Sequence, residues 1–272
     1  MATSSKTPPA FDWTDPLGFT DLLTDEEKLV QDSIRRFCQD ELQPGILEAN
    51  RAEKVDRSIF PRMGELGLLG STIEGYGCAG LNYVCYGIAA REVERVDSGY
   101  RSMMSVQSSL VMFPIHAFGS EIQREKYLPQ LASGEAVGCF GLTEPDHGSD
   151  PGGMRTRARS VEGGYRISGA KMWITNSTQA DFICLLANTS DESPHSNKSL
   201  IVVPMNLPGI SLSERFDKLG MRSSDTAQIF FDDVRVPQRN LIGAEGKGFR
   251  YQMEQFQEER IFGAAGALKM LE

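Results

Sequence analysis

The sequence has 272 residues, with 28 Lys and Arg against 37 Asp and Glu, which gives a formal net charge of −9 at neutral pH. This acidic balance argues against a general nucleic-acid binder or a protein of anionic membranes, because phosphate groups attract an excess of cations. The sequence has no stretch of about 18 apolar residues, so we expect no membrane span. The length allows one large domain or two ordinary ones.

Cysteine and histidine are sparse and scattered. The five cysteines form no CxxC pair, and the three histidines stand far apart. We therefore expect no metal site and no disulfide framework, and an intracellular, reducing compartment. The N-terminus has neither the apolar core of a secretory signal nor the arginines of a mitochondrial presequence. Residues 1–20 are predicted to be a lead-in to the first domain.

Residues 21–135 have the pattern of a helical domain. Thr24 and Glu27 form a capping box, with a hydroxyl at the N-cap and a carboxylate three residues later. Apolar residues then recur at helical spacing. Further helices are expected over 59–69, 84–96, about 98–112 and from Ser120.

Residues 136–237 have a different pattern, in which short apolar runs alternate with glycine and polar turns, as in a β domain. The expected strands are Cys139–Thr143, Tyr165–Ser168, Met172–Thr175, Phe182–Ala187, Leu200–Val203 and Ile229–Phe231. Helices followed by strands indicate separate α and β domains and not a βαβ sheet. For this reason the G-x-G-x-x-G stretch at 75–80 is interpreted as a loop between helices, although a dinucleotide site was the alternative.

Residues 238–272 return to helical spacing. Seven apolar positions fall on one stripe of a helix: Phe249, Met253, Phe256, Ile261, Ala264, Leu268 and Leu271. On the same wheel Arg260 lies near the centre of the stripe, Glu259 at its shoulder, and Glu258 opposite, where it should be solvated. The helix is still running at Glu272, so we expect a C-terminally truncated chain.

Two motifs resemble the diagnostic segments of the acyl-CoA dehydrogenase family. They are LTEPDHGSD at 142–150 and KMWITN at 171–176. The segments at 92–110 and 126–131 look most like glutaryl-CoA dehydrogenase, whereas 218–260 looks more like long-chain and isovaleryl-CoA dehydrogenases. The resemblance implies an α+β multidomain fold: an N-terminal helical domain, a middle antiparallel, β-barrel-like domain, and the beginning of a C-terminal helical bundle.

The resemblance also implies an FAD cofactor between the β domain and the bundle. A flavin is a flat ring with polar edges, so Trp173 can pack on its face while the hydroxyls of Thr143 and Thr175 meet its edges. The residues expected to contact the cofactor are Phe140, Gly141, Leu142, Thr143, Glu144, Ser149, Trp173, Ile174 and Thr175. Ser149 is also expected to touch the phosphate or pantetheine arm of the substrate.

The implied reaction is α,β-dehydrogenation of an acyl-CoA thioester, in which a carboxylate removes the α proton. In long-chain and isovaleryl enzymes the base is a Glu just before an Arg, which is Glu259 here. In the other subfamilies the base lies beyond this chain's end. Arg260 is expected to be buried and paired with CoA phosphate, and Met253 to contact the substrate. The alternative for Glu259 is an ion pair with a neighbouring helix.

Acyl specificity is predicted from Glu94, Arg101 and Ser102, which match residues that hold the distal carboxylate in glutaryl-CoA dehydrogenase. The alternative is a structural Glu94–Arg101 ion pair. A glutaryl-CoA-like substrate is favoured, with a long-chain or branched-chain enzyme as one alternative and a non-catalytic binding or structural fragment as another. The resemblance further implies a homotetramer, electron-transfer flavoprotein as acceptor, and the mitochondrial matrix, or the cytoplasm in bacteria.

Overall fold

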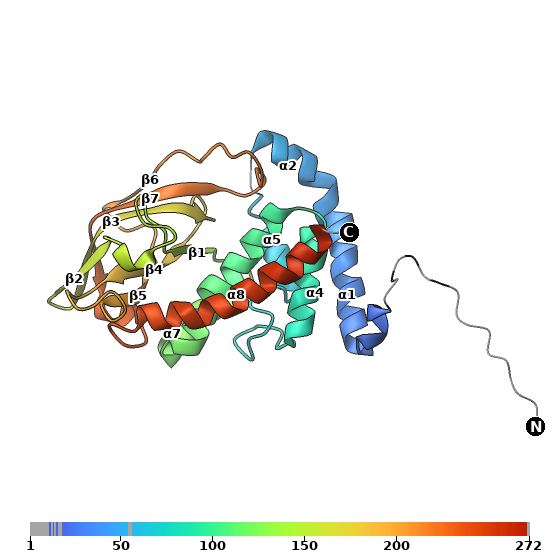
Figure 1. Cartoon of the computed structure of the whole chain (residues 1–272), viewed down its shortest axis with the longest axis horizontal. Coiled ribbons are helices and arrows are strands. Elements are labelled where there is room, and N and C mark those ends of the chain that lie inside the picture. Colours follow the sequence, from blue (N-terminus) through green and yellow to red (C-terminus); the bar gives the residue numbers. More distant parts are fainter. Residues whose placement is uncertain (1–10, 12, 14, 16–17, 54–55, 271–272) are drawn as a thin grey trace, which may run out of the picture.

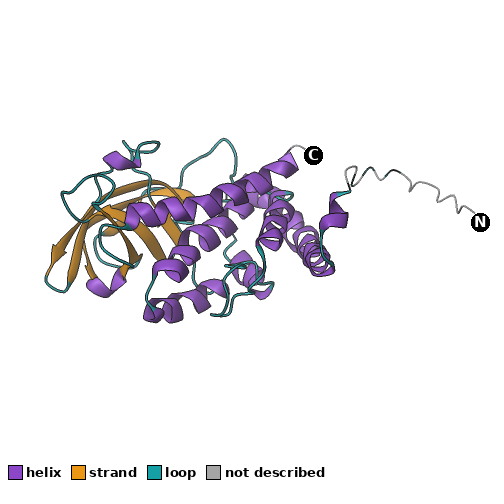
Figure 2. Ribbon diagram, turned by 60° about the horizontal axis from the view of Figure 1, so that its bottom comes forward, coloured by secondary structure: helices purple, strands orange, loops and turns teal. Residues whose placement is uncertain are grey.

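The computed structural model describes residues 11, 13, 15, 18–53 and 56–270, with side chains described up to Leu268. Most of the expected lead-in and Leu271 therefore lie outside the described residues. The strands occupy one end of the molecule and most helices the other, with the last helix lying along both (Figure 1, Figure 2). Within the described residues, no helix combines the length and the apolar character that a membrane crossing requires.

The helices predicted for the first domain begin within one residue of their expected positions. Thr24 Oγ1 accepts a hydrogen bond from Glu27 N at 3.2 Å, and the Glu27 carboxylate accepts one from Thr24 N at 2.8 Å, which closes the capping box. The α-helices are α1 (Asp25–Phe37), α2 (Ile46–Ala52), α3 (Ile59–Glu65), α4 (Tyr83–Glu94), α5 (Ser98–Ser105), α6 (Phe113–Phe118) and α7 (Glu121–Ala132). Residues 75–80 form the predicted loop, between α3 and α4, with Gly75 and Gly77 both at φ 82°.

Shorter helical turns complete this region. They are the 3₁₀ turns η1 (Phe19–Leu22) and η3 (Gln43–Gly45), and the π-helical segments η2 (Cys38–Leu42) and η4 (Val106–Met112). Segment η4 joins α5 to α6, so the expected helix over 98–112 exists but widens in its second half. π-Helical turns widen the backbone and are frequent beside functional sites.

The β region is one eight-stranded sheet. Its strands are β1 (Gly138–Gly141), β2 (Arg157–Val161), β3 (Gly164–Thr175), β4 (Phe182–Asn188), β5 (Lys198–Pro204), β6 (Ile210–Leu212), β7 (Thr226–Pro237) and β8 (Leu241–Ile242). The 3₁₀ turns η5 (Pro151–Gly153) and η6 (Gln238–Asn240) lie between strands. The expected runs at 165–168 and 172–175 are parts of the single strand β3.

The sheet corrects two details of the predicted β domain. Its order is β6-β7-β3-β2-β4-β5-β8, with β1 paired to β4, so β6 and β8 are open ends and the sheet does not close into a barrel. Most pairs are antiparallel, but β4 pairs in parallel with both β1 and β2. Strands β1 and β2 are separated from β4 in the sequence by at least one other strand. Parallel pairs of this kind need crossover connections, which strand periodicity does not reveal.

Helix α8 (Gly248–Met270) crosses from the β domain to α4 (Figure 1). It does not bury the predicted apolar stripe: Ile261 and Leu268 are 71% and 58% exposed. The buried face instead contains Gln252, Gln255 and Phe262. Gln255 faces inward, where its Nε2 donates to Leu110 O at 3.0 Å while its Oε1 has no partner among the described residues, so a polar side chain occupies a face that hydrophobic periodicity would give to apolar ones.

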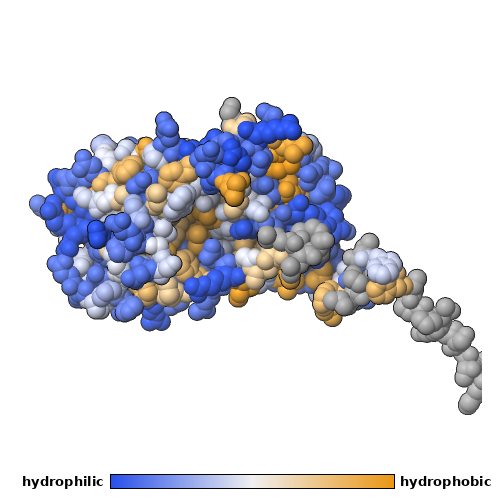
Figure 3. All heavy atoms as spheres, turned by 45° about the horizontal axis from the view of Figure 1, so that its top comes forward, coloured by the Kyte–Doolittle hydropathy of each residue, from blue (hydrophilic) through white to orange (hydrophobic). Residues whose placement is uncertain are grey.

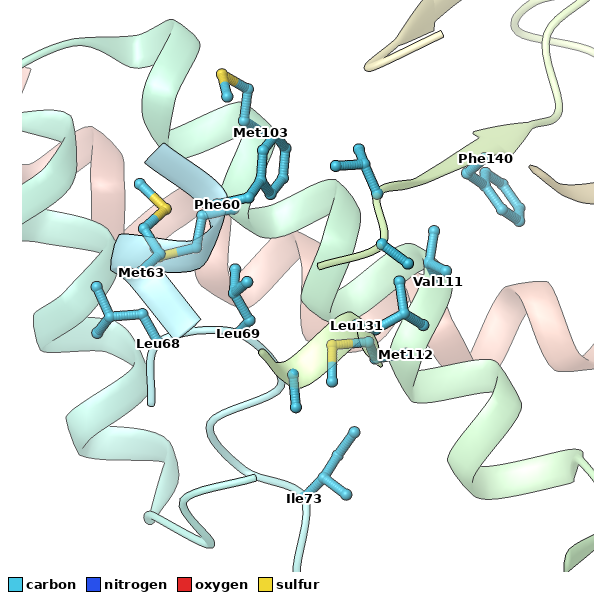
Figure 4. Close-up of a cluster of buried hydrophobic side chains, with 14 of the residues drawn as sticks. Phe60, Met63, Leu68, Leu69, Ile73, Met103, Val111, Met112, Leu131 and Phe140 are labelled. Atoms are coloured by element: carbon cyan, nitrogen blue, oxygen red, sulfur yellow. The ribbon is translucent and has the colours of Figure 1, made fainter. Parts of the chain in front are cut away.

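The larger hydrophobic core joins the helices to one side of the sheet. Figure 4 shows part of it, including Phe140 of β1 and Val111 and Met112 of η4. Both faces of β1 are buried, and Gly138 approaches Val111 so closely that a Cβ at this position would lie 2.6 Å from Val111 Cγ1. This contact sets η4 against the end of β1, where the site described below begins.

Candidate functional site

A cavity of about 180 Å³ lies between the β domain and the helices, and it brings together residues from four distant parts of the sequence. The lining residues are Val106, Leu110, Phe140, Leu142, Thr143, Trp173, Ile174, Thr175, Phe256 and Glu259. Figure 3 shows a hollow with hydrophobic walls between these two parts of the molecule. Six of the predicted cofactor contacts and the predicted base therefore share one cavity.

Close packing of β1 brings Thr143 to the cavity. Gly141 has no side chain at a point where a Cβ would lie 2.7 Å from Ile183 Cδ1 and 3.1 Å from Leu185 Cδ1. The chain can therefore run against β4 and then leave the sheet beside β3, where Met172 N donates to Thr143 O at 2.8 Å. The Thr143 side chain faces the cavity from this point.

Trp173 reaches the cavity through an unusual backbone conformation. Its φ is 61°, in the left-handed region that bulky residues avoid at a cost of about 1–3 kcal/mol. The strand register shifts between Lys171 and Ile174, so Trp173 is 57% exposed whereas Lys171, two residues earlier, is fully buried. Its ring packs 4.7 Å from that of Phe216. The bulge thus presents a large flat ring at the cavity.

Glu144 does not line the cavity, although it was predicted to contact the cofactor. Its carboxylate is buried and lies 2.9 Å from the ammonium of Lys171. Burial raises the pKa of Glu144, but Lys171 and backbone N–H groups outweigh this effect and lower the pKa overall. Burial lowers the pKa of Lys171 to about 8. The direct contact of Glu144 with a cofactor remains a prediction.

Glu259 lies on α8 with its side chain at the cavity. Burial raises the pKa of its carboxyl above the usual value, and the charges of Arg101 and Arg260 oppose that shift. A carboxylate with a raised pKa beside an apolar cavity has the properties of a general base.

Glu258 is a correction to the helical wheel. It was expected to be solvated, but it is half-buried and accepts a hydrogen bond from the Tyr83 hydroxyl. Burial raises the pKa of Glu258 as well. The two adjacent carboxylates therefore differ in position rather than in exposure: Glu259 faces the cavity, and Glu258 faces α4.

Arg260 is a second correction. The wheel predicted burial, whereas the side chain is exposed and its guanidinium lies 5.5 Å from the centre of the Phe256 ring. The reason is that α8 turns its glutamine face, not its apolar stripe, toward the helices. Met253 is half-buried and, like Arg260, does not line the cavity.

Glu94 and Arg101 form an ion pair, with Glu94 Oε2 2.7 Å from Arg101 Nε. Ser98 Oγ also donates to the Glu94 carboxylate. Arg101 does not line the cavity, but its positive charge lowers the pKa of Glu259. Ser102 follows on α5 and is half-buried, whereas Ser149 is exposed in the loop after β1. The structural ion pair that was the alternative therefore exists.

The cavity also has walls that sequence reasoning did not single out. Val106 and Leu110 come from η4, and their apolar character alone does not distinguish them from core residues. Phe256 was recognised only as a member of the apolar stripe. No local sequence signal identifies the π-helical segment η4 that carries Val106 and Leu110.

The family comparisons cover both regions of the chain. The model for "Acyl-CoA dehydrogenase, N-terminal domain" matches residues 24–135, and that for "Acyl-CoA dehydrogenase, middle domain" matches residues 139–234. Among curated relatives, mouse mitochondrial short-chain specific acyl-CoA dehydrogenase is 36% identical over 90% of this chain and 60% of its own length. An acyl-CoA dehydrogenase of Bacillus subtilis is 36% identical over 92% of this chain and 66% of its own.

Solved structures agree with these relatives. Glutaryl-CoA dehydrogenase from Mycobacterium smegmatis in complex with FADH2 superposes with a TM-score of 0.88 and 40% identity, covering 93% of this chain and 64% of the other. The chain thus spans about 60–66% of the length of these relatives. Two successive family models and structural neighbours across nearly the whole chain lead to one conclusion: the chain belongs to the acyl-CoA dehydrogenase family.

Proposed function

We propose that the protein is an FAD-dependent acyl-CoA dehydrogenase that removes hydrogen from the α and β carbons of an acyl-CoA thioester, with Glu259 as the base. The observation that carries the proposal is the shared cavity, in which Glu259 of α8 meets Thr143, Trp173 and Thr175 of the β domain. Family membership and the FADH2-bound neighbour support the choice of cofactor and reaction.

The residues at the cavity fit a flavin ring. Trp173 offers an exposed aromatic face, and the hydroxyls of Thr143 and Thr175 form no hydrogen bond with any other residue that the structure describes. Sites that enclose a whole organic ligand usually measure roughly 300–1,000 Å³. The cavity of about 180 Å³ therefore suits part of the ring system. When bound, FAD supplies a ring that accepts a hydride.

Glu259 performs the proton transfer in this proposal. The α hydrogen of a thioester is weakly acidic, so its removal needs a base whose proton affinity is raised by desolvation. Burial does this for Glu259, and the positive charges of Arg101 and Arg260 limit the rise in its pKa. Val106, Leu110 and Phe256 exclude water from the place where the proton moves.

We infer a glutaryl-CoA-like substrate, with Arg101 as the partner of the distal carboxylate. Two observations support this: the charge of Arg101, which acts on the pKa of Glu259, and 40–41% identity to the two glutaryl-CoA dehydrogenase structures from M. smegmatis. Because Glu94 already pairs with Arg101, an anionic tail would share the guanidinium with it. Ser102, Ser149, Met253 and Arg260 are proposed as further substrate contacts.

Partners and location are proposed on the same basis. Electron-transfer flavoprotein is the proposed acceptor, and a homotetramer the proposed assembly. The mouse relative is named as mitochondrial and another relative is bacterial, which supports the mitochondrial matrix or the bacterial cytoplasm. The proposed domain limits are 1–20, 21–135, 136–237 and 238–272.

Anaerobic reduction of bound flavin tests the proposal. The protein is reconstituted with FAD, separated from free FAD, and mixed with glutaryl-, butyryl-, isovaleryl- or palmitoyl-CoA. Bleaching of the flavin band, fastest with glutaryl-CoA, is the expected result. Faster bleaching with a long or branched chain would assign the alternative substrate class. A protein that retains no flavin would support a binding or structural fragment instead.

A further inference from the structure

A single buried ammonium holds the residues on both sides of Thr143. Lys171 Nζ donates to Leu142 O at 2.9 Å and to Glu144 Oε1 at 2.9 Å. The Lys171 side chain is completely buried, with 0% of its surface accessible. Together with the bond from Met172 N to Thr143 O, three consecutive residues are tied to β3. The side chain of Thr143 thus has a defined direction toward the cavity.

The carboxylate of Glu144 carries the restraint further along the chain. It accepts hydrogen bonds from Arg155 N at 2.6 Å and Thr156 N at 2.9 Å. Reciprocal backbone bonds between Glu144 and His147 close the turn between them. The loop from 144 to 156, which includes Ser149, is therefore anchored at both ends on one ion pair.

Lys171 also fixes one end of the strained segment that presents Trp173. The other end is Asn176, also fully buried, whose side-chain nitrogen donates to Met103 O at 3.4 Å and Gly138 O at 3.3 Å. Between these two anchors lies the register shift with Trp173 at φ 61°. Strained conformations persist where the surroundings over-determine them, and buried hydrogen-bonded groups on both sides meet that condition.

We propose that the Lys171–Glu144 ion pair is a positioning device that holds Thr143 and Trp173 in the geometry that a flavin ring requires, a role that rests on the function proposed above. Neither residue lines the cavity. A buried ion pair adds little net stability compared with apolar residues of similar size, but it fixes donors and acceptors in one arrangement. The proposed benefit is therefore geometry at the cavity and not stability of the fold.

The test compares the wild type with a Lys171→Met/Glu144→Leu double variant, in which neither charge is left unpaired. The control is an Arg35→Met/Glu92→Leu double variant, because it also removes an ion pair with a fully buried carboxylate, but one that joins α1 to α4. All variants carry Trp13→Phe, which leaves Trp173 as the sole tryptophan. Two properties are measured: FAD affinity by titration, and Trp173 emission and its quenching by acrylamide without FAD.

The double variant is expected to melt cooperatively but to bind FAD about tenfold more weakly or worse, since several buried charge-assisted hydrogen bonds are lost. Its Trp173 quenching should also change, while the Arg35→Met/Glu92→Leu control matches the wild type in both measurements. Unchanged FAD affinity and quenching in the double variant would overturn the proposal. If the wild type itself binds no FAD, the proposed function fails, and the quenching comparison alone still decides whether the pair positions Trp173.

Discussion

The charge of Arg101 acts on Glu259 across the junction of α5 and α8, and it opposes the rise in carboxyl pKa that burial produces. The same guanidinium lies 2.7 Å from the Glu94 carboxylate. Arg101 therefore connects a partly buried ion pair of the helical domain with the proposed base. This relationship makes the protonation of Glu259 depend on a residue that does not line the cavity.

Replacing Arg101 by Gln should move the acid limb of the pH–rate profile to higher pH. Burial raises the pKa of Glu259, and Arg101 is the stronger of the two positive charges that lower it. Without the guanidinium the pKa rises further, so a higher pH is needed to ionise the base. The measurement is the pH dependence of flavin reduction by butyryl-CoA, which has no distal carboxylate. Arg260→Gln is the control and should shift the limb less, because Arg260 is exposed and screened. An acid limb that stays in place in Arg101→Gln would contradict this account.

Trp173→Gly should be more stable than Trp173→Ala by about 1 kcal/mol, because glycine adopts φ 61° without the Cβ penalty that alanine meets. Both variants lose the contact with Phe216 and the aromatic face, so both should bind FAD more weakly than the wild type. Urea unfolding of the apoprotein measures the stability difference. Equal stability of the two variants would indicate that the backbone at this position is not strained.

Stability and catalysis should respond oppositely to Glu259→Gln. The folded-state pKa of Glu259 is raised, so the folded protein binds more protons than the unfolded chain between the usual value of 4.5 and the raised pKa. The wild type therefore loses stability as the pH rises through that window. Glu259→Gln should be more stable than the wild type at pH 7, and the difference should disappear below the model-peptide value. Urea unfolding at several pH values checks this, and a difference that grows on acidification would be contrary to it.

Gly141→Ala should destabilise the fold by about 1–3 kcal/mol, because its Cβ would press on Ile183 and Leu185 in a fully buried strand. The displaced β1 should also weaken FAD binding through Thr143. Gly45→Ala is the matched control, since no atom lies within 4 Å of its Cβ position and its φ is negative. Chemical denaturation and FAD titration measure the two effects. A Gly141→Ala protein as stable as Gly45→Ala would argue against the close packing of β1.

Local patterns predicted much of this fold because local physics determined it. The capping box at Thr24, the strands rich in Val and Ile, and the loop at 75–80 depend on hydrogen bonds or periodicity within a few residues. The two family motifs also placed Thr143, Trp173 and Thr175, which now share a cavity. These residues were identified from their joint occurrence, since a single Trp or Thr carries no such information.

The rest depends on tertiary contacts that a sequence pattern does not contain. The helical wheel predicted a buried Arg260 and an exposed Glu258. The observed orientation of α8 differs, with Gln255 hydrogen-bonded to a carbonyl of η4 and Glu258 hydrogen-bonded to Tyr83. Likewise, the role of Glu144 depends on its ion pair with Lys171, which lies on another strand. Closure of the sheet into a barrel also failed as a prediction, because edge pairing depends on all strands together.

The most direct test of the account compares Glu259→Gln with Glu258→Gln in anaerobic flavin reduction by acyl-CoA. Both carboxylates are half-buried with raised pKa values, but only Glu259 lines the cavity. We predict that Glu259→Gln binds FAD normally and is reduced roughly 100- to 10,000-fold more slowly, as expected for loss of a general base, while Glu258→Gln stays near the wild-type rate. Wild-type bleaching by Glu259→Gln, or loss of bleaching in Glu258→Gln alone, would contradict the assignment of Glu259 as the base.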